Sequence, residues 1–93
     1  MGMYKLDITT NALNFTKSSP PKQFKQIFTA ILDLLINPTP SDSSLLKGYS
    51  HLYRKDVGEY RIIYKFDDDT VYVILVGKRN DGEVYKQLKR KLG

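Results

Sequence analysis

The sequence contains no cysteine and a single histidine among its 93 residues. The absence of cysteine excludes disulfide bonds, cysteine-ligated zinc sites and thiol nucleophiles. His51 cannot assemble a metal cluster by itself, and its polar Gly-Tyr-Ser-His surroundings favour an exposed position over the role of a catalytic base. We therefore expect a protein that works without a metal and without a cofactor.

Long hydrophobic runs are missing as well. No apolar stretch approaches the roughly 20 residues that a membrane-spanning helix needs. The N-terminal stretch MGMYKLDITT lacks the pattern of a secretory signal peptide. These features predict a cytoplasmic protein with no membrane association.

Acidic side chains are in the minority: 15 Lys and Arg residues face 10 Asp and Glu residues, for a formal net charge of +5. A basic surface favours an anionic partner such as nucleic acid. The length allows one domain, expected to span residues 1–93, and the hydrophobic fraction of 41% supports a modest core.

The first half of the sequence predicts one strand and two helices. Residues 3–9 alternate between apolar and polar side chains, as in a half-buried strand. Residues 10–17 favour a short helix with Thr10 or Asn11 as its cap and Leu13 pointing inward.

A longer amphipathic helix is expected after Ser19-Pro20-Pro21, because serine is a favoured N-cap and proline is tolerated in the first turn. Its apolar residues recur every three or four positions and predict one continuous stripe, made of Phe24, Ile27, Phe28, Ile31, Leu32 and Leu35. Asn37-Pro38 ends the helix, and residues 37–44 predict a polar loop.

The second half predicts three strands, at residues 52–57, 60–66 and 71–76, followed by a basic helix that ends at Leu92. Gly58-Glu59 forms the first turn between these strands. In the last helix, Val84, Leu88 and Leu92 recur at helical spacing.

The resulting order, β-α-α-β-β-β-α, predicts an α+β fold: a four-stranded twisted sheet with a helical hairpin on one face and a short C-terminal helix. Asp67, Asp68 and Asp69 fall between the last two strands and raise the question of a magnesium site. Successive residues of a tight turn point apart and no second acidic cluster is available, so we interpret them as a hairpin turn.

Cations and one aromatic residue gather in the second half of the chain: Lys47, Arg54, Lys55, Arg61, Lys78, Arg79 and Tyr85. Phosphodiester cleavage without a metal needs charge stabilisation at the phosphoryl oxygens and a group that deprotonates or orients the attacking hydroxyl. Arginine suits the first task, and a tyrosine among cations suits the second or can stack on a base. A solvated strand end beside a packed tyrosine would show the same residue types, so composition leaves both interpretations open.

Five short motifs carry a family resemblance: Leu-Lys-Gly at 46–48, Leu-Tyr-Arg at 52–54, Val-Gly-Glu-Tyr-Arg-Ile-Ile-Tyr at 57–64, Val-Tyr-Val-Ile-Leu-Val-Gly-Lys-Arg at 71–79 and Glu-Val-Tyr at 83–85. They are similar to motifs of the RelE branch of the RelE/ParE toxin superfamily. The expected element order fits that family too, so the resemblance covers nearly the whole chain.

The resemblance implies the toxin of a type II toxin-antitoxin system that acts as a ribosome-dependent mRNA endoribonuclease. Such a toxin cuts mRNA in the ribosomal A site by metal-independent 2′-hydroxyl attack and inhibits translation. By position, Arg61 would stabilise the phosphoryl charge, Arg79 would contact the scissile phosphate, and Tyr85 is the candidate base.

The remaining basic residues of the set are expected to contact RNA: Lys47, Arg54, Lys55 and Lys78. A cognate antitoxin is the implied protein partner, beside the ribosome and mRNA. Homo-oligomers are expected only within a toxin-antitoxin complex.

One position departs from the family pattern. Asp56 stands two residues after Arg54, where RelE members commonly place a second cation, and its charge would oppose a nearby phenolate. Lys47, Lys55, Lys78 or the ribosome would then have to supply the missing positive charge. Two other functions stay open: a ParE-like inhibitor of DNA gyrase, which needs no nuclease site, and a non-catalytic basic RNA-binding module.

Overall fold

The computed structural model describes residues 3–79 and 82–92, with the side chains at 83, 84, 91 and 92 left out. The elements are β1 (Lys5–Ile8), α1 (Thr10–Ser18), α2 (Pro21–Ile36), β2 (Ser43–Leu45), β3 (Tyr53–Val57), β4 (Tyr60–Phe66), β5 (Thr70–Lys78) and α3 (Glu83–Leu92). The expected alignment of Val84 and Leu92 with Leu88 therefore lies outside the described side chains. No helix in the described ranges is long and apolar enough to cross a bilayer.

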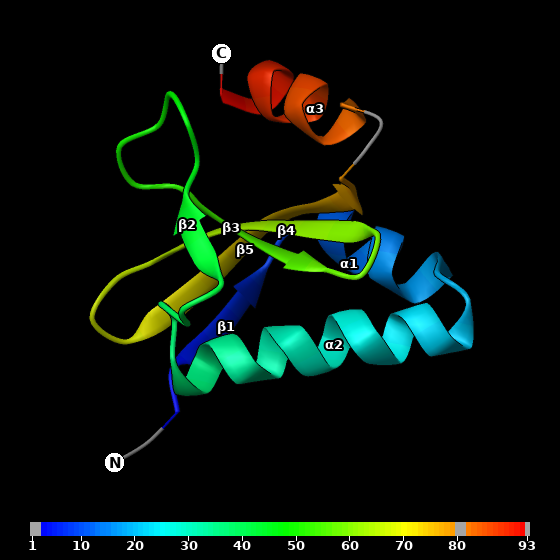
Figure 1. Ribbon diagram of the computed structural model, residues 1–93, viewed down its shortest axis with the longest axis horizontal. Coiled ribbons are helices and arrows are strands. Elements are labelled where there is room, and N and C mark those ends of the chain that lie inside the picture. Colours follow the sequence, from blue (N-terminus) through cyan, green and yellow to red (C-terminus); the bar gives the residue numbers. More distant parts are fainter. Residues whose placement is uncertain (1–2, 80–81, 93) are drawn as a thin grey trace.

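The strands form one five-stranded sheet in the order β1-β5-β4-β3-β2. β1 runs parallel to β5, and the other neighbours are antiparallel. Figure 1 shows the sheet between two helical layers, with α1 and α2 on one face and α3 on the other. The helical hairpin and the C-terminal helix of the α+β prediction are confirmed.

The predicted number of strands, four, was wrong. Residues 43–45, expected to be part of a polar loop, pair antiparallel with residues 53–55 as β2. The Ser43 amide and hydroxyl both hydrogen-bond to the Pro40 carbonyl, at 3.0 and 2.8 Å, and this turn directs the chain back along β3. A strand held by backbone pairing at the edge of a sheet needs no apolar alternation, so the pattern gave no sign of it.

α2 packs on the sheet with a narrower apolar face than the predicted stripe. Ile27, Ile31 and Leu35 are buried as expected, and Leu34 is buried beside them. Phe24, Phe28 and Leu32 are instead between 38% and 42% exposed. The helix is turned so that its 27-31-34 row, rather than its 24-28-32 row, meets the sheet.

The N-cap of α1 is Thr9, one residue before the predicted caps Thr10 and Asn11. The hydroxyl of Thr9 accepts a hydrogen bond from the Ala12 amide at 3.1 Å and donates one to the Ile74 carbonyl at 2.7 Å. This residue therefore caps the helix and ties it to β5. Ala12 is fully buried, whereas Leu13, predicted to point inward, is 39% exposed.

The junction between the two helices also differs from the prediction. Ser19 is the C-cap of α1 rather than the N-cap of α2, and its hydroxyl donates to the Phe15 carbonyl at 2.9 Å. Pro20 takes the N-cap position of α2, which has no side-chain capping bond.

The second face of the sheet carries a smaller apolar core under α3. Leu88 is fully buried there, and its cluster contains Leu46, Leu52, Ile63, Ile74 and Leu75. Tyr85 packs against the same cluster from one turn earlier in the helix. The core thus fixes the helix that carries the tyrosine of the candidate site.

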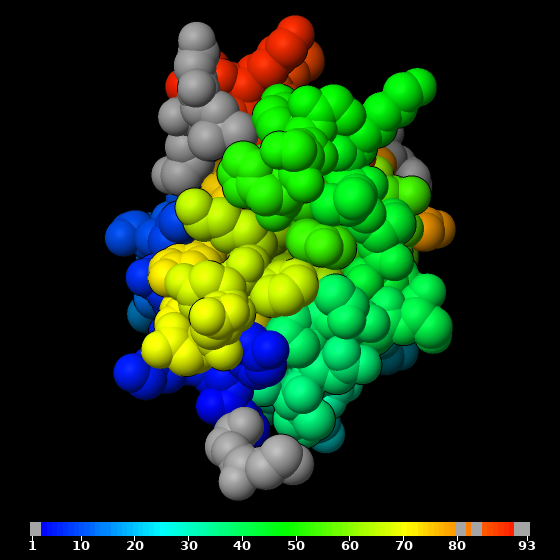
Figure 2. Space-filling view, turned by 90° about the vertical axis from the view of Figure 1, so that its left-hand side faces the viewer, coloured from blue at the N-terminus to red at the C-terminus, as the bar shows by residue number. Residues whose placement is uncertain are grey.

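The β4–β5 hairpin turn is confirmed. Asp67 accepts hydrogen bonds from the amides of Asp69 and Thr70, both at 3.0 Å, and from the Tyr72 hydroxyl at 2.9 Å. The turn (yellow in Figure 2) lies at the surface beside β1 (blue), where the Lys5 amide donates to the Asp69 carbonyl at 2.8 Å. Across the described parts of the chain, no three His, Asp or Glu side chains are grouped as a metal site.

Candidate active site

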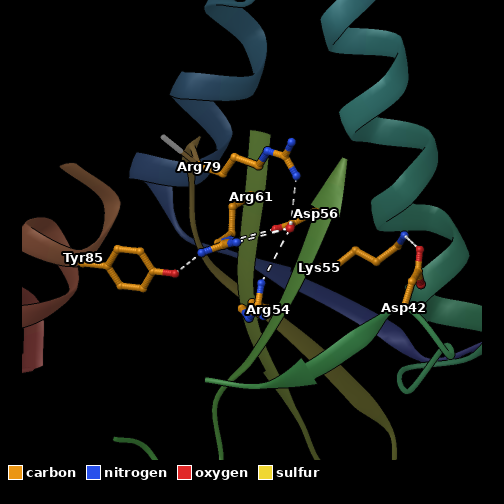
Figure 3. Close-up of polar contacts among 7 residues, drawn as sticks. All are labelled: Asp42, Arg54, Lys55, Asp56, Arg61, Arg79 and Tyr85. Carbon is orange, nitrogen blue, oxygen red and sulfur yellow. Dashed lines mark hydrogen bonds and ion pairs between the residues drawn. The ribbon is translucent and has the colours of Figure 1, made fainter. Parts of the chain in front are cut away.

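Arg61 lies at the centre of a polar cluster on the α3 side of the sheet. Its Nη1 donates a hydrogen bond to the Tyr85 hydroxyl, and its guanidinium carbon is 5.8 Å from the centroid of the tyrosine ring. Figure 3 shows the ring of Tyr85 entering from α3 and the guanidinium of Arg61 meeting it from β4. The contact joins two residues that are 24 positions apart in the sequence.

Asp56 binds the other side of the same guanidinium. Nε of Arg61 donates to Oδ1 at 2.7 Å, and Nη2 donates to Oδ2 at 3.2 Å. The two residues are cross-strand partners, because the Gly58-Glu59 turn pairs Val57 with Tyr60 and the next pair outward is Asp56 with Arg61. The positive φ of Gly58, 58°, is a backbone conformation that favours glycine in such a turn.

The charges of this pair support each other. The hydrogen bond from Arg61 holds the pKa of the Asp56 carboxyl below its ordinary value, with smaller contributions from Arg54 and Arg79. Asp56 in turn raises the pKa of Arg61, and the Tyr85 hydroxyl contributes in the same direction. A carboxylate and a guanidinium joined by two such hydrogen bonds are both charged at neutral pH.

Two further arginines approach the same carboxylate. Nη1 of Arg54 is 3.6 Å from Oδ2 of Asp56, and Nη1 of Arg79 is 3.5 Å from it. The backbone amide of Arg79 donates to the Glu59 carbonyl at 3.0 Å, which holds the end of β5 against the β3–β4 turn. The side chains of Arg54 and Arg79 are 37% and 44% exposed, against 15% for Arg61. Arg61 is thus fixed, while the other two arginines stand at the surface.

A pocket of about 400 Å³ opens beside the Arg61–Tyr85 contact. Its lining consists of Leu46, Lys47, Arg54, Arg61 and Tyr85. Three of these side chains are cations and none is an acid. Guanidinium groups match the geometry of phosphate oxygens, so the pocket is chemically suited to a phosphate group.

Other residues singled out in the sequence lie elsewhere. Lys55 extends to the α2 side of the sheet, where it pairs with Asp42 (Figure 3). Lys78 is exposed and is the cross-strand partner of Tyr60, which packs in the core under α1 and α2. His51 is exposed, as predicted, with Nδ1 3.3 Å from the Ser50 hydroxyl. The structure therefore brings Lys47, Arg54, Arg61, Arg79 and Tyr85 together and places Lys55 and Lys78 apart from them.

The contact of Asp56 with three arginines was not foreseen. The sequence did contain a sign of it: counting back from the predicted turn at Gly58-Glu59 places Asp56 opposite Arg61. A carboxylate opposite a guanidinium on the same sheet face is a favourable cross-strand pair.

The pocket lies between the face of the five-stranded sheet that α3 covers and α3 itself, and its basic lining is chemically suited to an anion. A family model described as the ParE toxin of the type II toxin-antitoxin system parDE matches residues 7–82. The chain belongs to this family of type II toxin-antitoxin toxins.

Within this family, similarity to known relatives identifies the chain as a RelE-type toxin of the RelE/ParE superfamily. A protein named "Putative toxin RelE1" from Methanocaldococcus jannaschii is 30% identical over 83 residues, which cover 85% of this chain and 92% of the relative.

Solved structures agree with this placement. A free, mutant form of E. coli toxin RelE superposes with a TM-score of 0.79 at 25% identity, covering 99% of this chain and all of that one. The toxin in the intact E. coli RelBE toxin-antitoxin complex gives a TM-score of 0.70 at 26% identity, covering 83% of this chain and 98% of that chain.

Proposed function

We propose that this toxin is a ribosome-dependent endoribonuclease that cleaves mRNA in the A site and thereby inhibits translation. The observation that carries the proposal is the contact between Arg61 and Tyr85 at the edge of a basic pocket. It puts a candidate base beside a permanent positive charge, and Lys47 and Arg54 line the same pocket. A site for an RNA 2′-hydroxyl next to a site for its phosphate is the minimum that metal-free cleavage requires.

In the proposed reaction, the 2′-oxygen attacks the adjacent phosphorus while Tyr85 removes its proton. Arg61 and Arg79 offset the charge that builds on the non-bridging oxygens. The bond from phosphorus to the 5′-oxygen breaks, and that oxygen takes up a proton from solvent water, which balances the proton lost from the 2′-hydroxyl. The products are a 2′,3′-cyclic phosphate and a 5′-hydroxyl, with no metal or cofactor involved.

The proposal includes a protein partner and a cellular compartment. RelE toxins of similar fold have been solved in complex with RelB antitoxins, so we expect a cognate antitoxin to bind this chain. Because the proposed substrate is mRNA on translating ribosomes, we expect the protein to act in the cytoplasm. Self-association is expected only within the toxin-antitoxin assembly.

The direct test is cleavage of mRNA on programmed ribosomes by the wild type, Arg79→Ala and Lys17→Ala. Loss of the Arg79 guanidinium is expected to slow cleavage roughly 100-fold, as removal of a donor to a developing oxyanion does. Lys17 lies at the end of α1, so Lys17→Ala removes one positive charge outside the cluster and is expected to keep the wild-type rate. Wild-type cutting by Arg79→Ala would refute the assigned role. Naked RNA is a poor substrate for this assay, because the ribosome positions the scissile bond.

A second candidate is inhibition of DNA gyrase, favoured by the ParE description of the matching family. Incubation with gyrase and supercoiled DNA distinguishes gyrase inhibition from mRNA cleavage. Gyrase inhibition without cleavage on ribosomes would favour the ParE function. A non-catalytic RNA-binding module would instead bind RNA with a steep salt dependence and release no product.

A further inference from the structure

Asp56 is the least expected member of the cluster, because an acid near a phosphate pocket weakens the attraction for RNA. We propose that Asp56 is a positioning residue, which fixes the guanidinium of Arg61 so that its Nη1 end faces Tyr85 and the phosphate pocket. The inference rests on the proposed function for its kinetic consequence. Its structural content is independent of that function.

The hydrogen bonds of Arg61 determine which part of the guanidinium can meet a ligand. Nε and Nη2 are directed to the two oxygens of Asp56, at 2.7 and 3.2 Å, and Nη1 is directed to the Tyr85 hydroxyl. A guanidinium is a planar fork with five N–H groups, so fixing one edge fixes the direction of the rest. One further N–H group remains on each of Nη1 and Nη2, at the end of the fork, and Arg61 is one of the residues that line the pocket.

In a competing interpretation, the Asp56 carboxylate occupies the place of an RNA phosphate, and the arginines leave it when RNA binds. The distances from Asp56 to the three arginines show which contacts a phosphate could replace and which contact positions an arginine. Arg54 and Arg79 approach Asp56 only to 3.6 and 3.5 Å and are the more exposed, so a phosphate can take these two away from the carboxylate. The short, two-pronged contact with the mostly buried Arg61 is the one that stays. Charge-assisted bidentate pairs of this kind are the strongest and most directional hydrogen bonds in proteins.

Removing the charge of Asp56 therefore has opposite effects on binding and on chemistry. Asp56→Asn has nearly the same shape, removes one negative charge beside the pocket and weakens the fork on Arg61. Attraction for RNA phosphates should hold or increase, while the arginine loses the orientation that the reaction needs.

The kinetic test compares Asp56→Asn with Asp68→Asn on programmed ribosomes. Asp68 lies in the β4–β5 turn, at the far end of β4 from Arg61 (Figure 1), and its substitution changes the net charge by the same amount. We expect Asp56→Asn to lower kcat at least about tenfold with KM unchanged or lower, the signature of a group needed in the transition state. We expect Asp68→Asn to keep both constants. An unchanged or higher kcat in Asp56→Asn, or a change confined to KM, would overturn the proposal.

A second measurement does not depend on catalysis. The NMR signal of the Arg61 Nε–H group is assigned by its absence in Arg61→Lys and followed in the free toxin. We expect it to be shifted downfield and slow to exchange with water in the wild type and in Asp68→Asn, and to lose both properties in Asp56→Asn. An unaltered signal in Asp56→Asn would refute the positioning role even if cleavage fell. If the signal responds as expected but the wild type cuts nothing on ribosomes, the proposed function fails and the positioning of Arg61 stands.

Discussion

Arg61 donates a hydrogen bond to the hydroxyl of Tyr85, and this contact links the central sheet to α3. The ring also lies beside the guanidinium, 5.8 Å from its carbon to the ring centroid. Tyr85 therefore offers two separable features, an oxygen that can take part in proton transfer and an aromatic face that packs. A substitution that removes only the first feature can tell them apart.

Tyr85→Phe is expected to slow cleavage on ribosomes by about 100-fold or more, the usual contribution of a general base. The ring and its packing against the α3 core remain, so stability should change little. Tyr72→Phe is the matched control, because its hydroxyl bonds Asp67 at the β4–β5 turn. Wild-type cleavage by Tyr85→Phe would exclude the tyrosine as the base and leave it a packing role.

Leu88→Ala tests whether the apolar core under α3 positions the site. Leu88 is fully buried, so its truncation is expected to lower the free energy of unfolding by about 2 kcal/mol or more. Cleavage should fall further than the unfolded fraction explains, because the helix also carries Tyr85. Denaturant titration and single-turnover cleavage on the same sample measure the two effects.

Leu32→Ala provides the control for that prediction. Leu32 is 38% exposed on α2, so the same chemical change removes fewer contacts and should cost less than half as much stability. It should leave cleavage at the wild-type rate. Equal losses in both variants would show that the core under α3 has no special relation to the site.

Part of this architecture followed from the sequence. β4 has the predicted bounds, Tyr60–Phe66. A tight turn flanks it on each side, and its side chains alternate between the two faces of the sheet. The bounds of β3 were within one residue of the prediction. Where local pattern and turn chemistry agree, they also determine which side of a strand each residue occupies.

The missed features depend on partners far along the chain. β2 exists because β3 offers it a backbone edge. Lys55 alternates with Arg54 and Asp56 along β3, so it points to the other face of the sheet, where it pairs with Asp42. The exposed row of Phe24, Phe28 and Leu32 looks the same in sequence as the buried row beside it. Periodicity identifies an amphipathic helix, but its rotation against the sheet is set by tertiary packing.

Tyr64 gives a prediction about stability alone. It is fully buried, and its hydroxyl donates to the Pro38 carbonyl at 2.6 Å. This bond holds the segment after α2 against β4. Tyr64→Phe leaves that carbonyl without its donor and is expected to cost about 1–3 kcal/mol of unfolding free energy. Urea unfolding should show this shift, whereas Tyr72→Phe, at the surface, should stay within about 0.5 kcal/mol of the wild type.

The same tyrosine has a signature at high pH. Burial raises the pKa of Tyr64 above its ordinary value of 10.0, so the folded state keeps the phenol proton longer than the unfolded chain does. This contribution to stability is present below pH 10.0 and is lost as the pH rises through the folded-state pKa. The stability difference between wild type and Tyr64→Phe should therefore shrink in alkaline solution. A constant difference would contradict the assignment.

Asp56 predicts the opposite behaviour in acid. The hydrogen bond from Arg61 holds the pKa of the Asp56 carboxyl below its ordinary value of 3.8. A lowered folded-state pKa means that the unfolded chain binds the proton first as the pH falls. The carboxylate therefore stabilises the fold above pH 3.8, and this stabilisation disappears as the pH falls through the folded-state pKa.

Urea unfolding of the wild type and Asp56→Asn between neutral pH and strongly acidic pH measures this contribution. At neutral pH the wild type should be the more stable, since it keeps the two-pronged pair with Arg61. The two curves should converge in acid, because a protonated Asp56 and an asparagine offer Arg61 similar, uncharged acceptors. Asp68→Asn, with the same change in charge, should run parallel to the wild type throughout. A gap between wild type and Asp56→Asn that stays constant into acid would mean that the carboxylate is not ion-paired in solution, and the arginine cluster would then have to be held by contacts other than Asp56.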